Sequence, residues 1–260
     1  MTGPLSAFWH TPPMRDPWAL AHDAAGAAGV SLRQLDGVDD GDAVNDVIER
    51  TWGGQHLDRE IVRALGFSGN TVLGAEVDGR LVGFALGWAG IDGDGLHVHS
   101  HMLATVPDAR RRGVGYALKL AQRALALEQG VTTMRWTFDP MIARNAWLNL
   151  GKLGAVADRF YPDFYGAMAD AINAGERSDR LVIRWDLDRE PGPRDAGPEA
   201  VRIEVPTDHE RLRVEDPPAA AVWRARVAER VAEATDEGRH ALAFDRDASA
   251  YLFAHEEASA

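Results

Sequence analysis

The most constraining feature of this sequence is an arginine- and glycine-rich turn between a strand-like and a helix-like segment. Residues 105–118 are TVPDARRRGVGYAL, so an apolar run stops at Pro107 and Arg-x-x-Gly-x-Gly leads into a helical pattern. Glycines let a backbone approach a ligand closely, and the first turn of a helix presents unpaired N–H groups with partial positive charge. The turn also carries three permanently charged side chains, Arg110, Arg111 and Arg112. It therefore predicts a site for a phosphate or pyrophosphate.

This basic turn stands out because the rest of the chain is acidic. The formal net charge is −12, which disfavours nucleic acid as a general partner. The alternative interpretation is a solvated basic turn that simply leads into a surface helix. A strand before the turn and a helix after it favour the anion-binding interpretation.

Composition narrows the class of protein further. The chain has 260 residues and no cysteine, so neither disulfides nor thiolate chemistry contributes. The first residues do not resemble a signal peptide, and no run reaches the roughly 18 apolar residues of a membrane span. We expect a cytoplasmic protein without membrane partners, and the composition is compatible with a homo-oligomer.

The order of elements predicts a mixed α/β fold, with a central mixed twisted sheet flanked by helices. The pattern along residues 18–187 is β-α-α-β-β-β-α-β-α-(β)-β after a first helix at 18–28. Asp78-Gly79 predicts a tight hairpin between strands 71–77 and 81–88. Residues 1–189 form the main predicted domain, residues 190–199 a breaker-rich linker, and residues 200–260 a small α+β extension.

The turn and its flanking elements resemble the acyl-CoA motif of GNAT N-acyltransferases, which is Pro-x-x-Arg-x-x-Gly-x-Gly between a strand and a helix. The matching residues are Pro107, Arg110, Gly113 and Gly115. The resemblance implies an acetyl-CoA or other acyl-CoA cosubstrate, a small-molecule amine as acceptor, and no metal. It also implies that the strand backbone pairs with the pantetheine arm and that the loop holds the pyrophosphate, through Leu103, Ala104, Thr105, Arg110, Arg111, Arg112, Gly113, Val114 and Gly115.

The chain departs from the family pattern in the helix that follows the fifth strand. Many members have a tyrosine there that protonates the leaving thiolate, but this chain has Leu150 at the corresponding position. Tyr161, Tyr165 or a water molecule are the alternatives. Asn145 and Asn149 are expected either to bind the pantetheine amides or to be ordinary polar residues of a helix surface.

Three histidines alternate along the strand that enters the turn. His97, His99 and His101 share one strand face, about 6.6–7 Å apart from one to the next. They are either structural histidines or, for His99 and His101, a base or substrate contact, because a pKa near neutrality suits removal of a proton from an amine.

Further residues are candidates for contacts with the acceptor. Asp139 and Arg144 flank the start of the helix after the fifth strand and could recognise the ammonium and carboxylate of an amino acid, or act as a helix cap and a surface ion pair. Trp52 and Trp88 could wall the pocket.

Three functional hypotheses remain open at this level. HSHML, WTFDP and NLGKLGA resemble an uncharacterised bacterial GNAT subgroup, some members of which are associated with N-succinylation of amino acids, so succinyl-CoA joins acetyl-CoA as a donor. A non-catalytic acyl-CoA sensor is the main alternative, which the missing tyrosine favours. A nucleotide-binding protein is a weaker one, because the turn lacks Gly-Lys-Ser/Thr.

Overall fold

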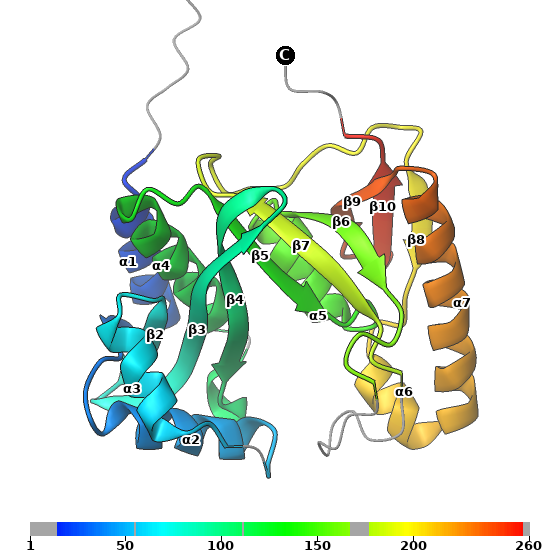
Figure 1. The fold of residues 1–260 in the computed structure, drawn as a ribbon. Helices are drawn as coiled ribbons and strands as arrows, with labels where there is room; N and C mark the ends of the chain where they lie inside the picture. The colour runs from blue at the N-terminus through cyan, green and yellow to red at the C-terminus, as the bar shows by residue number, and fades with distance from the viewer. Residues whose placement is uncertain (1–14, 55, 111, 167–176, 257–260) are drawn as a thin grey trace, which may run out of the picture.

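The computed structural model describes residues 15–54, 56–110, 112–166 and 177–256. In this part of the chain, ten strands form one mixed sheet in the order β1-β2-β3-β4-β5-β7-β6-β9-β10-β8 (Figure 1). The strands are β1 (Ser31–Gln34), β2 (Val72–Val77), β3 (Arg80–Asp92), β4 (Gly95–Thr105), β5 (Thr133–Phe138), β6 (Val156–Tyr161), β7 (Arg180–Asp186), β8 (Val201–Glu204), β9 (His240–Asp245) and β10 (Ala250–Ala254).

Helices cover both faces of this sheet, so the predicted mixed α/β class is confirmed. In Figure 1, α1 lies beside α4 at the back of the first strands, while α2 and α3 lie near their lower ends. The α-helices are α1 (Pro17–Ala28), α2 (Asp40–Thr51), α3 (Arg59–Phe67), α4 (Val114–Glu128), α5 (Ala143–Ala146), α6 (His209–Glu215) and α7 (Pro217–Asp236). Pro107–Ala109 form a short 3-10 helix, and Trp147–Lys152 continue α5 as a π-helical segment.

The hairpin predicted at Asp78-Gly79 is present between β2 and β3. Asp78 has φ 49° and Gly79 has φ 73°, the left-handed conformation that a two-residue turn of this kind requires. The next hairpin extends further than expected, because the strand predicted at residues 81–88 continues to Asp92. Long pairing of β3 with β4 places the histidines well inside the sheet.

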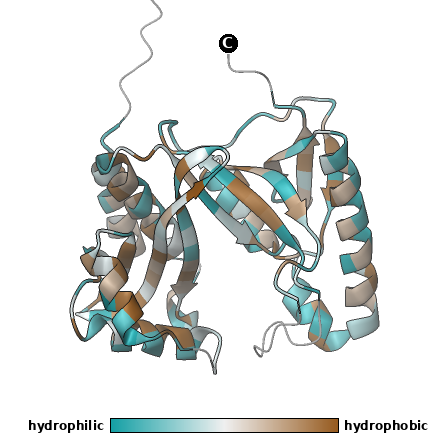
Figure 2. Ribbon diagram, viewed as in Figure 1, coloured by the Kyte–Doolittle hydropathy of each residue, from teal (hydrophilic) through white to brown (hydrophobic). Residues whose placement is uncertain are grey.

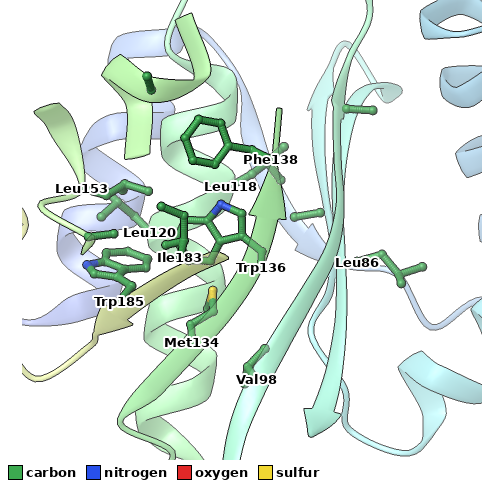
Figure 3. Close-up of a cluster of buried hydrophobic side chains, with 14 of the residues drawn as sticks. Leu86, Val98, Leu118, Leu120, Met134, Trp136, Phe138, Leu153, Ile183 and Trp185 are labelled. Atoms are coloured by element: carbon green, nitrogen blue, oxygen red, sulfur yellow. The ribbon is translucent and has the colours of Figure 1, made fainter. Parts of the chain in front are cut away.

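The core lies between the middle strands and α4. Figure 3 shows Met134 and Trp136 of β5 and Val98 of β4 gathered with Leu118 and Leu120 of α4. Apolar side chains at alternate strand positions give this face of the sheet its hydrophobic character. Apolar colour runs along the central strands in Figure 2, whereas the surface loops are polar.

The segment after residue 199 continues the sheet. Strand β9 pairs with β6 at Ala157↔Ala241, and β10 and β8 follow outward. Two helices, α6 and α7, also belong to this segment. Residues between β7 and β8 also pack against the fold, because Arg194 donates to the Gly154 carbonyl at 2.7 Å and pairs with Glu256 at 3.1 Å. Among the described helices, none combines the length and apolar character that crossing a bilayer requires.

Candidate functional site

The candidate site centres on a fork between β4 and β5. These parallel strands pair only at Val98↔Met134 and His99↔Arg135, and then separate (Figure 1). The cause is visible on the other side of β4. Leu86 pairs with Met102 and the next residue pairs with Ser100, so His101 is an extra residue. Such a bulge bends its strand, here away from β5.

Separation leaves the β5-facing edge of β4 without a strand partner beyond His99 in the described structure. Main-chain groups on a strand edge are strong hydrogen-bonding groups and can pair with an extended ligand. Leu103, Ala104 and Thr105, predicted to bind the pantetheine arm, occupy this edge. Arg110 Nε donates a long hydrogen bond of 3.4 Å to the Thr105 carbonyl at this edge.

The predicted anion-binding turn lies at the end of β4. Gly113 has φ 93°, a left-handed conformation that favours glycine, and α4 begins at Val114. The first hydrogen bond of the helix runs from Ala117 N to the Gly113 carbonyl, so the preceding N–H groups have no intrahelical acceptor. Arg110 and Arg112 are exposed beside them, while Arg111 lies outside the described residues. The arrangement suits an anion at the N-terminus of α4.

Three elements meet around Gly115 in the first turn of α4. A Cβ at Gly115 would lie 3.6 Å from Leu103 of β4 and 4.0 Å from Leu148 of the π-helical segment. The predicted pantetheine edge, the turn and the segment carrying Asn145 and Asn149 therefore adjoin one another. Asn149 is buried and Asn145 is half-buried.

Leu150 belongs to the core. Its side chain is fully buried. The position at which the family resemblance implied a tyrosine therefore faces inward, and leucine has no proton to donate.

The histidines line the face of β4 opposite α4. His99 and His101 lie with their ring centroids 5.8 Å apart, and the Trp88 ring of β3 packs against them in a tilted geometry, with centroids 5.2 Å and 4.7 Å away. His97 is separate and buried, with Nδ1 3.3 Å from the Gly95 carbonyl. The predicted shared face is therefore present, and Trp88 is part of it. In the described residues no three His, Cys, Asp or Glu side chains are placed to hold a metal ion.

The surroundings of these histidines disfavour their charged forms. Burial, then the neighbouring His101, His97 and Lys119, lowers the pKa of His99 to about 4. Burial also lowers the pKa of His101. The pKa near neutrality that the sequence predicted for a base is therefore not found at His99. His99 stays neutral near pH 7 and is a weak base.

The two candidate tyrosines differ in position. The Tyr165 hydroxyl lies 3.3 Å from Thr137 Oγ1 on β5, just beyond the last β4–β5 pair. The Tyr161 ring packs on Phe164, away from this contact, and both tyrosines are exposed. Trp52, at the C-terminal end of α2, is half-buried against the core.

Asp139 and Arg144 each have an ion-pair partner from the C-terminal segment. Arg224 of α7 binds both carboxylate oxygens of Asp139, at 3.2 and 2.9 Å. Glu210 of α6 accepts two hydrogen bonds from Arg144. Neither Arg224 nor Glu210 was predicted as a partner, because the sequence does not indicate that α6 and α7 return to the start of α5.

A further group at the fork was also missed. Lys119 of α4 donates from Nζ to Ser100 Oγ at 2.8 Å, and Nζ lies 3.6 Å from the Trp136 ring centroid. Ser100 Oγ donates to Gln122 Oε1 at 2.8 Å, and Gln122 Nε2 donates to Thr71 Oγ1 at 3.1 Å. In the sequence, Lys119 and Gln122 look like the polar face of a surface helix. They instead lie on the side of α4 that packs against the sheet, and because α1 lies beside α4 as well, the helix is buried on nearly all sides.

Comparison with known proteins agrees with this geometry. The model of the acetyltransferase (GNAT) family matches residues 42–151, which include β4, the turn, α4 and β5. No curated protein matches the sequence significantly.

Several solved structures are similar in fold. The ribosomal-protein-S18-alanine N-acetyltransferase of Escherichia coli is 16% identical, with 62% of this chain and 96% of that chain covered and a TM-score of 0.49. Diaminobutyrate acetyltransferase EctA from Paenibacillus lautus, in complex with L-2,4-diaminobutyric acid and coenzyme A, is 17% identical, with 63% and 98% covered and a TM-score of 0.45. The putative acetyltransferase yncA from Salmonella typhimurium, with acetyl-CoA, is 18% identical, with 64% and 98% covered and a TM-score of 0.47.

At such identities and TM-scores these similarities say nothing about substrate. The family match and the β4–turn–α4–β5 arrangement concern the same residues. Residues 42–151, which contain this unit, are therefore similar to the acetyltransferase (GNAT) family.

Proposed function

We propose that this protein is an acyl-CoA-dependent N-acyltransferase that moves an acetyl or succinyl-type group to the amine of a small molecule such as an amino acid. The observation that carries the proposal is that two binding features lie next to each other on the unit formed by β4 and α4. One is the unpaired edge of β4 beyond His99, and the other is the free N-terminal turn of α4.

The donor would lie along this unit. The α4 N-terminus, with Arg110 and Arg112, would hold the pyrophosphate, and Arg111 is proposed to join them. The pantetheine arm would then run back along Leu103–Thr105 toward the fork, with Asn145 and Asn149 as its proposed amide partners. The thioester would lie where the strands begin to separate.

The reaction needs little chemistry from the protein because a thioester is already activated. The acceptor nitrogen attacks the carbonyl carbon, the C–S bond breaks, and a proton passes from the amine to the departing sulfur. Main-chain N–H groups near Leu103 and Ala104 are proposed to stabilise the oxyanion. Orientation of the two reactants supplies much of the remaining rate.

The acceptor would approach from the face opposite α4, where Trp88, His99 and His101 border the fork on one side and Tyr165 on the other. Because burial keeps His99 neutral, we assign it to accepting a hydrogen bond from the amine, and the more exposed His101 to removing the proton. Tyr165 is proposed to protonate the thiolate. Asp139 and Arg144 would reach an acceptor only by exchanging their partners Arg224 and Glu210.

The test is direct. Purified protein is incubated with acetyl-CoA or succinyl-CoA and a panel of amino acids and amines, and released CoA is followed with a thiol-reactive dye. The chain has no cysteine, so the dye reports CoA alone. Amine-dependent CoA release is expected. Tight acyl-CoA binding with no release for any amine would favour the sensor function, and no CoA binding at all would refute both.

A further inference from the structure

Lys119 is unusual in this chain. It is one of only two lysines among 28 lysines and arginines, and its side chain is 2% exposed in the middle of α4. Arginine cannot lose its charge in a protein, whereas lysine can. A lysine at this buried position is therefore suited to a site that is neutral in one state and charged in another.

The position of its amine relative to the fork is well defined. Ser100 and Trp136 are the residues directly after the last paired positions of β4 and β5, and both contact Lys119 Nζ. The amine therefore lies where the two strands part. From there Ser100, Gln122 and Thr71 continue the polar chain away from the fork, with hydroxyl and amide groups but no negative charge.

Two other buried arginines in the described chain have carboxylate partners, whereas Arg123 donates to the main-chain carbonyls of Leu187 and Arg189. Arg135 is 6% exposed and pairs with Asp94 and Asp158, and Arg224 is 6% exposed and pairs with Asp139. Within residues 15–54, 56–110, 112–166 and 177–256, no carboxylate lies within ion-pair distance of Lys119. Burial accordingly lowers its pKa well below the ordinary value, and His99 is the histidine whose protonation its charge opposes. A buried amine of this kind gains most from a ligand that brings its own negative charge.

We propose that Lys119 binds a carboxylate at the far end of the donor's acyl group, so that thioesters of short dicarboxylic acids are preferred to acetyl-CoA. The inference rests on the proposed function, because it takes its direction from the donor's path. A pantetheine arm that runs from the α4 N-terminus back along β4 directs its acyl end to the point where β4 and β5 meet. Two cations lie near that point: Arg135 is already paired with Asp94 and Asp158, and Lys119 has no such partner among the described residues.

The carboxylate would convert a neutral amine into a paired ammonium. Binding of a dicarboxylic donor should therefore be accompanied by uptake of about one proton, which acetyl-CoA binding should lack. Trp136, already packed on Nζ, would stabilise the ammonium through its ring face.

Isothermal titration calorimetry tests this in the unmodified full-length protein near neutral pH. Succinyl-CoA, malonyl-CoA and acetyl-CoA are titrated in two buffers with different enthalpies of ionisation, which gives affinity and proton uptake together. We expect at least one of the two dicarboxylic donors to bind about tenfold or more tightly than acetyl-CoA, with about one additional proton taken up. Lys119→Met should remove both differences.

Lys152→Met is the matched control. Lys152 is exposed, with its Nζ 5.6 Å from the Tyr116 ring centroid, and its loss should leave donor preference and proton uptake unchanged. Equal affinities and equal proton uptake for all three donors in the unmodified protein would overturn the inference, whether or not the variant folds. Failure of every acyl-CoA to bind would instead refute the proposed function.

Discussion

The two faces of β4 at the fork both carry titratable side chains, but in different surroundings. On one face His99 and His101 pack against Trp88 and retain partial access to solvent, with His101 the more exposed. On the other face the side chain of Lys119, which belongs to α4, is buried against Ser100 and Trp136. A side chain that remains accessible can meet a diffusing acceptor. One that is buried can meet only a group delivered between the strands. This difference supports the proposal that the acceptor approaches one face and the donor's acyl group the other.

The largest expected effect comes from a substitution in the turn that is proposed to bind the donor. Gly113→Val should lower CoA affinity by about 100-fold or more, because a β-branched residue disfavours φ 93° and would displace the N–H groups that begin α4. Calorimetry with CoA measures this.

Gly130→Val supplies the control, since Gly130 has φ 75° at the other end of α4 with open space around it. It shares the backbone strain without touching the turn, so it should bind CoA normally. Equal loss of affinity in both variants would mean that strain in the fold, and not the turn, sets CoA binding.

The second effect concerns the acceptor face. Tyr165→Phe should lower kcat by about 10²-fold with little change in acyl-CoA affinity, because the phenol is proposed to donate the proton that the thiolate needs. Tyr161→Phe, which alters a ring packed on Phe164, should retain most of the activity. Unchanged rates in both single variants and in the double variant would assign the proton to water.

The sequence predicted the parts of the site that depend on short-range interactions, and it missed those that depend on long-range ones. The turn at residues 107–115 and the histidine alternation depend on neighbours within a few positions, so pattern and spacing were enough to find them. The roles of Arg224 and Glu210 depend on pairings across 85 and 66 residues, which no local pattern encodes. Lys119 was missed for a related reason: polar residues at helical spacing normally indicate solvent, whereas here this face of α4 packs against Ser100 and Trp136 of the sheet.

The third effect tests the acceptor's carboxylate. Arg144→Lys should raise KM for an amino acid about tenfold while leaving KM for the acyl-CoA unchanged, because lysine retains the charge but cannot form the two-pronged contact. Steady-state kinetics with an amino acid and its decarboxylated amine measure this. If the amine is used as well as the amino acid, or if only the acyl-CoA KM rises, Arg144 belongs to the donor side or to the pair with Glu210 alone.

The fourth effect compares the charge states of the histidine face. Because the pKa of folded His99 is about 4, below the ordinary value of 6.5, the folded state binds fewer protons than the unfolded state between these values. Its contribution to stability is therefore complete above pH 6.5 and is lost as pH falls toward 4. Thermal melts across this window should show a smaller loss of Tm in His99→Gln. His56→Gln, which changes an exposed histidine, should melt like the unmodified protein.

The smallest expected effect concerns the stability of the unliganded protein and tests Lys119 on the donor face. With no donor bound, the buried amine of Lys119 lacks a counter-charge, and its hydrogen bond and ring contact offset only part of its loss of hydration. Methionine has a similar length and no polar end, and Ser100 would keep its bond to Gln122. Lys119→Met should therefore raise Tm of the unliganded protein by about 2–4 °C, while Lys152→Met leaves it unchanged. Saturation with a dicarboxylic acyl-CoA should reverse the order, since only the lysine then gains an ion pair. A lower Tm for Lys119→Met without ligand would show that the polar chain from Lys119 to Thr71 holds the fold together, and the donor face would then be as much structural as functional.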